Sequence, residues 1–176
     1  DAGEVMIAEI QGTADEAALI NNTVITGGIV TAVFDGVEPY TGAGFNGNLG
    51  GFFMQDVKGD EDPMTSDAIY VNSVESVAVG DSVIVAGLVM ENFGLTVIDD
   101  LTSLEIKSSG NTLPPPVSVT LPFDSVESFE KYESMLVSIS NELTVTENRN
   151  LENFGEVRLS SNGLLVQPTQ VVDPND

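Results

Sequence analysis

The chain has 176 residues, of which 41% are hydrophobic, and it carries 28 acidic residues against 5 basic ones, for a formal net charge of -23. This length and hydrophobic content suit one domain, or one domain and part of another, and they exclude a disordered acidic tail. Histidine and cysteine are absent, which excludes disulfides, imidazole and thiolate metal sites, histidine bases and cysteine nucleophiles.

The acidic balance also limits the partners that we expect. A net charge of -23 is typical of a solvated acidic surface, and it disfavours simple binding to polyanions. No apolar run approaches the roughly 20 residues of a membrane span, and no signal-peptide pattern opens the chain. We therefore expect no membrane contact, and we expect that a leader, if one existed, has been removed.

The start of the chain predicts two strands and a loop. Residues 5–11 alternate in a way that predicts a first strand. Residues 23–34 are rich in β-branched side chains and contain adjacent glycines, Gly27 and Gly28, a pattern typical of a bulged strand that bends around a small barrel. Residues 35–48 are rich in glycine, proline and asparagine, which predicts a loop.

The stretch from residue 50 to residue 71 predicts two half-buried strands on either side of an acidic connection. Phe52 and Met54 in the first strand, and Ile69 and Val71 in the second, fall on one side of a period-two pattern. The connection, residues 56–67, is rich in aspartate and contains a glycine and a proline that favour turns.

Further short strands follow at residues 82–90, 95–98 and 104–107, separated by turns. Short strands at this spacing predict a small antiparallel barrel, with a sandwich as the alternative. The long bulged strand favours the barrel.

Three prolines at 114–116 predict a stiff linker, and they divide the chain into a barrel at 1–113 and a second part at 114–176. In the second part, residues 124–127 have the form of a capping box and predict one short helix. Strands are predicted at 135–139, 142–146, 155–159 and 164–167, which together form a partial second β unit. The apolar residues of this unit predict that it docks on the barrel, with edge-to-edge dimerisation as the alternative. They are Tyr132, Met135, Leu136, Val137 and Ile139.

Several short blocks occur in a definite order along the chain. The first are Glu9-Ile10-Gln11-Gly12, Gly51-Phe52-Phe53-Met54-Gln55-Asp56, Thr65-Ser66-Asp67, Val79-Gly80-Asp81 and Gly94-Leu95-Thr96. The later ones are Tyr132-Glu133-Ser134-Met135-Leu136-Val137, Leu143-Thr144-Val145-Thr146-Glu147, Phe154-Gly155-Glu156-Val157 and Gln167-Pro168-Thr169. Taken in order, the blocks resemble the OB-fold region of large secreted bacterial nucleases, and the resemblance covers nearly the whole chain.

This resemblance implies a fold, a location and a role. It implies a mainly β, OB-fold-like antiparallel barrel followed by a partial second β unit, and an extracellular parent protein with an endonuclease/exonuclease/phosphatase catalytic domain downstream. None of the catalytic residues of that domain is matched here. The chain is therefore expected to be a non-catalytic accessory module that recruits or positions nucleic acid. The alternative is a structural or calcium-stabilised spacer or interaction module of a secreted protein.

Two groups of residues are candidate sites. OB folds bind nucleic acid with stacking rings and basic side chains, for which we single out Phe45, Phe53, Lys58, Tyr70 and Phe93. Rings that alternate along strands also suit the core. Non-specific affinity for nucleic acid comes mostly from basic side chains that neutralise phosphates. The small number of basic residues in this chain therefore predicts weak binding to single- or double-stranded nucleic acid.

The second candidate site is the acidic connection. Four aspartates, Asp56, Asp60, Asp62 and Asp67, supply the hard oxygen ligands that calcium prefers. Their spacing does not match an EF-hand loop, and a plain solvated loop is the alternative interpretation.

Overall fold

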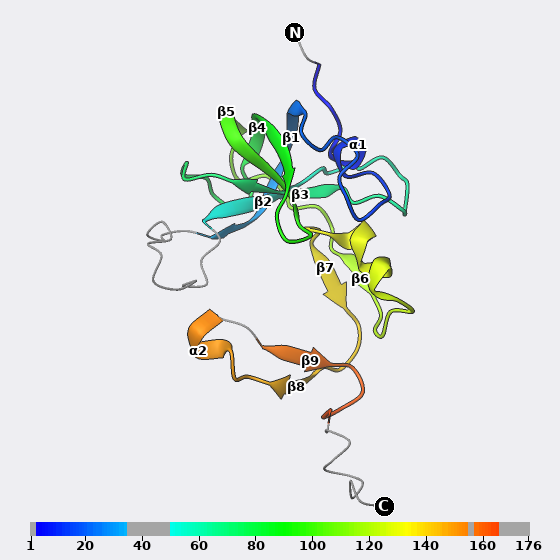
Figure 1. Cartoon of the computed structure of the whole chain (residues 1–176). Helices are drawn as coiled ribbons and strands as arrows, with labels where there is room; N and C mark the ends of the chain where they lie inside the picture. The colour runs from blue at the N-terminus through cyan, green and yellow to red at the C-terminus, as the bar shows by residue number, and fades with distance from the viewer. Residues whose placement is uncertain (1–2, 35–49, 155–156, 166–176) are drawn as a thin grey trace, which may run out of the picture.

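The computed structural model describes residues 3–34, 50–154 and 157–165 (Figure 1). It is mainly β: five strands form a mixed sheet that closes into a ring, and two smaller sheets and short helices accompany it. The predicted loop at 35–48 and the end of the strand predicted at 164–167 lie outside the described residues. Residues 164 and 165, which are described, are not in a strand.

The ring contains β1 (Thr23–Phe34), β2 (Gly51–Gln55), β3 (Ala68–Asn72), β4 (Ser82–Glu91) and β5 (Thr96–Ser108). The strand order is β1-β2-β3-β5-β4, and β1 pairs with β4 to close the sheet. The prediction of an antiparallel sheet is wrong at one pair, because β3 and β5 run parallel. A closed ring with an odd number of strands cannot alternate direction throughout, so one neighbouring pair must be parallel.

The strand β1 bends where it passes from one partner to the other. Its first half pairs with β4 and its second half with β2, and the pairing with β2 shifts register between Val30 and Ala32. The predicted bulge therefore lies just after the glycine pair. At Gly28, a Cβ atom would lie 3.0 Å from the carbonyl oxygen of Gln55, so glycine is needed where the end of β2 approaches.

The strand β5 is one long element where the sequence predicts two short ones. It pairs with β4 along its length, with a register shift between Ala86 and Leu88. The residue at this shift is Gly87, where a Cβ atom would lie 2.7 Å from the carbonyl oxygen of Asp99. The polar residues near 100 therefore form an irregularity within β5, and the strand continues beyond them.

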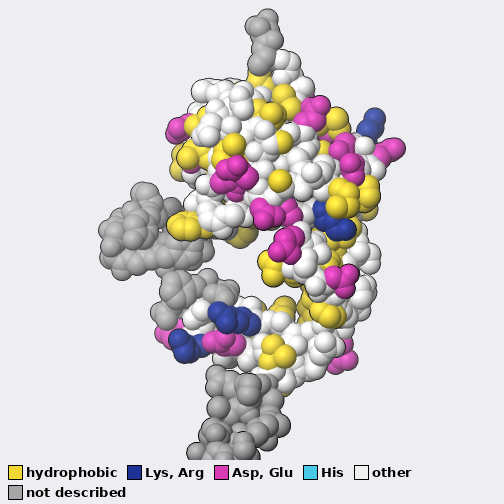
Figure 2. All heavy atoms as spheres, turned by 45° about the vertical axis from the view of Figure 1, so that its right-hand side comes forward, with side chains coloured by type: hydrophobic (Ala, Val, Ile, Leu, Met, Phe, Trp, Pro, Cys, Tyr) yellow, Lys and Arg dark blue, Asp and Glu magenta, His cyan; other side chains and the backbone are white. Residues whose placement is uncertain are grey.

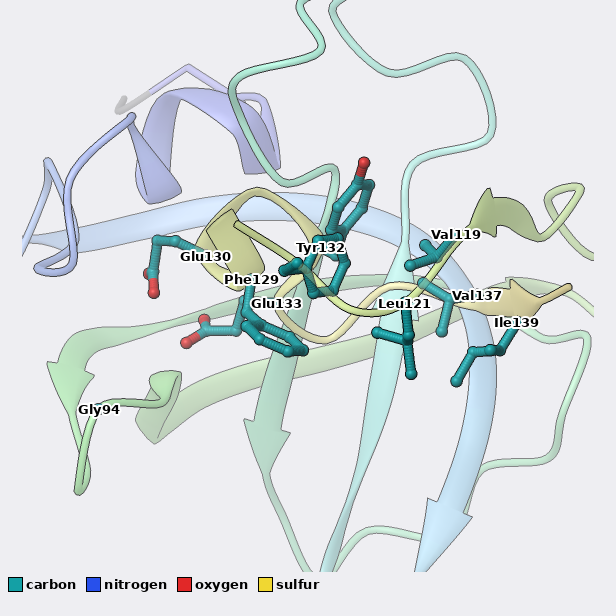
Figure 3. A pocket seen from close by; sticks show the side chains of 10 residues that line it. Gly94, Val119, Leu121, Phe129, Glu130, Tyr132, Glu133, Val137 and Ile139 are labelled. Carbon is teal, nitrogen blue, oxygen red and sulfur yellow. The ribbon is translucent and has the colours of Figure 1, made fainter. Parts of the chain in front are cut away.

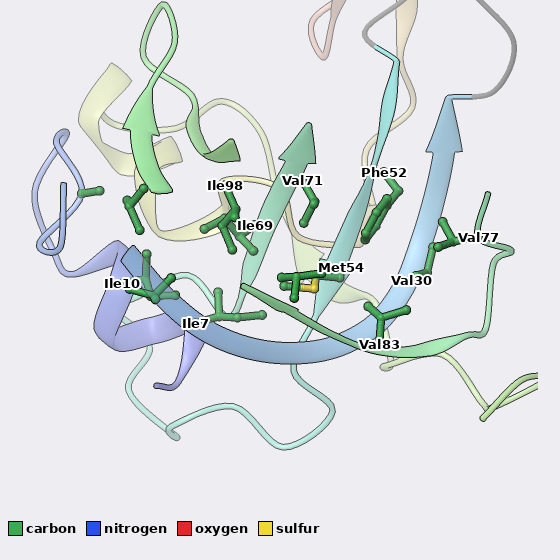
Figure 4. Packing of buried hydrophobic residues seen from close by; sticks show 14 residues of the cluster. Ile7, Ile10, Val30, Phe52, Met54, Ile69, Val71, Val77, Val83 and Ile98 are labelled. Atoms are coloured by element: carbon green, nitrogen blue, oxygen red, sulfur yellow. The ribbon is translucent and has the colours of Figure 1, made fainter. Parts of the chain in front are cut away.

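The hydrophobic core fills the ring (Figure 4). Phe52, Met54, Ile69 and Val71 are each at most 1% exposed, which confirms the predicted inward face of β2 and β3. Burying one such side chain stabilises the fold by about 1.5–3 kcal/mol.

The prediction of a strand at residues 5–11 is wrong. The segment forms α1 (Ile7–Gln11), and Ile7 and Ile10 point from it into the core (Figure 4). Apolar residues occur on both sides of the alternating pattern here, so period two does not identify a single buried face. The three-residue spacing of Ile7 and Ile10 places both on one side of a helix.

The second part consists of small elements around two sheets. β6 (Val117–Val119) pairs in parallel with β7 (Val137–Ile139), and a 3₁₀-helix, η1 (Val126–Tyr132), lies between them in the sequence. The predicted short helix is thus confirmed, but its capping box is not: the N-cap is Ser125, without a side-chain capping bond.

The last elements are β8 (Thr144–Glu147), α2 (Leu151–Phe154) and β9 (Arg158–Ser160), with β8 and β9 antiparallel. Figure 1 shows this sheet farther from the ring than β6 and β7. The division into domains at 113/114 stays a prediction.

Candidate functional site

The predicted aromatic site is only partly assembled. Phe53 of β2 faces Tyr70 of β3 in register, and their ring centroids lie 5.1 Å apart. Phe34 at the end of β1 adds a third ring, in edge contact with Phe53 at 5.7 Å. The sequence interpretation missed Phe34. The feature that could have indicated it is its position at the end of the strand that pairs with β2.

These rings are packed against one another rather than presented to solvent. Tyr70 is only 4% exposed, and its hydroxyl donates to the carbonyl oxygen of Gly50 at 3.0 Å. Burial, with a smaller contribution from the charge of Asp99, raises the pKa of Tyr70 to about 12. Phe53 is half-buried. The pair therefore suits a small aromatic cluster on the sheet better than an open stacking platform.

The other candidate residues lie elsewhere. Phe93 is at the tip of the turn between β4 and β5, where it is fully exposed and has a left-handed φ of 56°. Lys58 lies in the acidic connection, where its backbone N–H donates to Asp56. Phe45 lies outside the described residues. No ring contact joins Phe93 to Phe53 or Tyr70 in the part of the chain that the structure describes.

The aspartates of the acidic connection hold its own backbone. The Asp56 carboxylate accepts the N–H of Lys58 at 2.9 Å, and the Asp62 carboxylate accepts the N–H of Met64 at 2.9 Å. The Asp60 carboxylate accepts the N–H of Asp62 at 2.8 Å.

Asp67 completes this arrangement, because its carboxylate accepts the N–H of Asp60 at 3.2 Å. Desolvation is the main cause that raises the pKa of Asp67. Among the described residues, no group of three or more acidic side chains is arranged to hold a metal ion. The geometry favours a self-capped loop, and calcium binding remains the untested alternative.

The structure contains a hollow that the sequence did not predict. It has a volume of about 350 Å³ and lies between the β6–β7 sheet, η1 and the β4–β5 turn (Figure 3). Its lining is mostly apolar, with two carboxylates. The lining residues are Gly94, Val119, Leu121, Phe123, Phe129, Glu130, Tyr132, Glu133, Val137 and Ile139.

Three rings form the centre of this lining. Phe123 contacts Phe129 edge-on at 4.2 Å between centroids and stacks on Tyr132 at 5.6 Å. In Figure 3, the side chains of Glu130 and Glu133 lie at one end of the hollow, and those of Leu121, Val137 and Ile139 lie toward the other. The hollow therefore has an aliphatic end and an acidic end.

Glu133 sits where the hollow meets the ring. Its Oε1 accepts hydrogen bonds from Gln11 Nε2 and from the Thr96 N–H, each at 3.1 Å. Burial raises the pKa of Glu133 to about 7, against the two hydrogen bonds and with smaller contributions from the charges of Glu130 and Glu91. Its carboxyl group therefore changes charge near neutral pH.

A neighbouring carboxylate, Glu91, is also partly enclosed. Its Oε1 accepts the N–H of Ala17 and the hydroxyl of Thr96, both at 2.9 Å. Its Oε2 is buried and has no hydrogen-bond partner among the described residues. The sequence signal for this acidic group was weak, because Glu133 is one of several charged residues in the stretch around Glu130 and Lys131, and Glu91 is next to a predicted turn.

Comparison with known proteins assigns no family. Neither a protein-family model nor a curated protein sequence matches the chain. Within the described residues, no helix has both the length and the apolar character needed to cross a membrane.

Proposed function

We propose that the chain is a non-catalytic OB-fold module of a secreted nuclease, and that it positions its partners instead of transforming them. The observation that carries the OB-fold part of this proposal is the strand order β1-β2-β3-β5-β4, with β1 closing on β4 and β3 parallel to β5. We take this arrangement as support for an OB fold, a small five-stranded Greek-key barrel that binds oligonucleotides and oligosaccharides in other proteins. The link to a secreted nuclease rests on the sequence blocks that resemble the OB-fold region of those proteins.

The proposal of a role without catalysis rests on the residue types present. A sequence without histidine and cysteine lacks the usual general base and the usual thiol nucleophile. The raised pKa of Glu133 does not change this, because Glu133 is engaged by Gln11 and Thr96 as part of a structural contact.

Contact with nucleic acid is expected to be weak. OB folds bind oligonucleotides on the face of strands 2 and 3 and on the loops beside it, and here Tyr70 on that face is buried. Among the candidate rings that the structure describes, Phe93 in the β4–β5 turn is the fully exposed one. Two cations are already engaged in ion pairs, Lys107 with Glu105 and Arg158 with Glu147.

A nuclease assay tests the non-catalytic part of the proposal. The purified chain is incubated with plasmid and with single-stranded DNA in magnesium, calcium or manganese, and we expect both substrates to stay intact. Cleavage that depends on the metal and disappears in an Asp60→Ala variant would contradict the proposal. An Asp124→Ala variant is the matched control, because it removes one carboxylate outside the acidic connection.

A second candidate function is contact with another protein segment. It is favoured by the apolar hollow beside η1, which has acidic residues at one end. Cation-poor, acid-rimmed apolar surfaces suit a protein partner better than a phosphate backbone.

A further inference from the structure

The hollow beside η1 continues along the C-terminal part of the molecule. A second hollow, of about 400 Å³, shares Leu121, Phe123 and Phe129 with the first. It extends to Val126, which is 81% exposed, and to Leu159, which is 49% exposed. We call the two together the apolar groove. Contiguous exposed apolar surface of this kind marks interaction sites.

The charged residues that line the groove are acidic. Glu130 and Glu133 line its first hollow, and Glu91 lies close enough to both to influence their pKa values. Lys131 is nearby, but it lines a different hollow, beside the acidic connection, and its Nζ lies 5.2 Å from the Tyr132 ring centroid. Figure 2 shows acidic, basic and hydrophobic side chains close together on this face of the molecule, with more acidic than basic ones.

We propose that the apolar groove binds an extended peptide segment in which large apolar side chains are followed by lysine or arginine. The apolar side chains lie on the aliphatic end formed by Leu121, Val137 and Ile139, and the cation lies against Glu130. The apolar anchor supplies most of the affinity, and the charge pair fixes the direction of the segment.

The groove fits such a segment better than a second copy of this chain. Two copies that each carry a net charge of -23 repel one another. A copy also offers few cations for the acidic end, because Lys107 pairs with Glu105 and Arg158 with Glu147. A peptide from a basic region of another protein domain has both apolar groups that match the groove and the cationic groups that the groove lacks.

Fluorescence anisotropy with a short labelled peptide tests the proposal. The probe holds two leucines followed by two lysines in a glycine–serine background, and the protein is the full chain. We expect saturable binding, which is lost when the leucines are replaced by serine and is weakened at least threefold when the lysines are replaced by glutamine. Equal binding of the serine peptide would contradict the proposal, since it would show only attraction to an acidic protein. No binding of the leucine–lysine probe would contradict it as well.

Variants locate the binding on the molecule. Phe129→Ala removes part of the groove and is expected to weaken the peptide about tenfold or more, an effect of about 1.4 kcal/mol. The Glu130 side chain makes no hydrogen bond among the described residues, so Glu130→Gln changes little besides the charge. This substitution is expected to weaken peptide binding about threefold. Glu142→Gln makes the same charge change at an exposed position outside the groove and is expected to have no effect.

Two further measurements make the result decisive. Melting curves of each variant show whether it folds, and Glu130→Gln stands in for Phe129→Ala if the latter does not. Light scattering over a concentration series reports self-association. A dimer that dissociates in Phe129→Ala would assign the groove to a second copy and contradict the proposal. None of these readouts depends on DNA, so the proposal stands or falls separately from the role of Phe93.

Discussion

Gln11 and Glu133 are 122 residues apart in the sequence and are joined by a hydrogen bond of 3.1 Å from Gln11 Nε2 to Glu133 Oε1. Gln11 Nε2 also donates to the buried carbonyl oxygen of Ala68 at 2.7 Å. Because Glu133 Oε1 accepts the Thr96 N–H as well, one carboxylate ties α1 and the start of β5 to the segment that follows η1. Two further bonds connect this segment to the ring, from Ser66 Oγ to the Glu133 carbonyl and from the Leu136 N–H to Gln55 Oε1.

The first prediction concerns this carboxylate. Glu133→Ala leaves the Thr96 N–H without its acceptor, and we expect a loss of about 1–3 kcal/mol in the free energy of unfolding. Glu133→Gln keeps an acceptor oxygen and should cost less at neutral pH. Urea unfolding of both variants measures the difference. Equal losses would show that Glu133 acts through its charge and not through these hydrogen bonds.

The second prediction concerns pH. The pKa of Glu133 is raised to about 7, mainly by burial, so the folded state holds its proton more tightly than the unfolded chain. The contribution of protonated Glu133 to the stability of the folded state is therefore present at low pH and is lost as the pH rises through about 7. Glu130 and Glu91 face the same group, and the pKa of Glu130 is also raised, mainly by desolvation.

We therefore expect the native protein to gain stability relative to Glu133→Gln as the pH falls from about 8 to about 5. The gain should be about 1 kcal/mol, because the carboxyl group is partly solvated and its pKa shift converts only in part into stability. Urea unfolding of both proteins across this range provides the measurement. A stability difference that stays constant with pH would exclude titration of Glu133 in the folded state.

The third prediction tests the helix that replaces the predicted first strand. Ile10 is fully buried, so Ile10→Ala should cost about 2–5 kcal/mol. Val145 is 54% exposed in β8, and Val145→Ala should cost less than about 0.5 kcal/mol. Denaturant unfolding gives both values. If the two substitutions have similar effects, α1 is not part of the core.

The fourth prediction concerns calcium. Because the aspartates of the acidic connection accept bonds from their own loop, we expect millimolar calcium to leave the melting temperature unchanged. A ligand that binds only the folded state raises this temperature by mass action. A rise that disappears in an Asp60→Ala, Asp62→Ala double variant would instead establish a calcium site.

Period-two alternation was enough to place the central strands. Phe52 and Met54 alternate with side chains of the other face, and in an extended strand this spacing translates directly into one buried face. Residues 5–11 were predicted wrongly because apolar side chains occur at both helical and strand spacing there. The parallel pairing of β3 with β5 follows from closing five strands, which no local pattern reveals.

The candidate site was less accessible to sequence reasoning. Glu133 becomes notable only through Gln11 and Thr96, which lie 122 and 37 residues away, and through burial by elements that are separate in the sequence. Tyr70 and Phe93 are both aromatic residues next to glycine or apolar residues, yet one is 4% exposed and the other fully exposed. Their exposed fractions differ because Tyr70 lies in a strand and Phe93 at the tip of a turn, and residue type alone does not show this.

The most direct test of the proposed role is the binding of single-stranded DNA by the isolated chain. The probe is a labelled oligothymidine longer than the roughly 16 nucleotides that one OB fold covers, and anisotropy is measured from about 50 to about 200 mM salt. A positioning module with this acidic surface is expected to bind weakly at low salt, to lose binding as salt rises, and to bind more weakly still as Phe93→Ala. Tight binding that persists at high salt and is unaffected by Phe93→Ala would contradict the account.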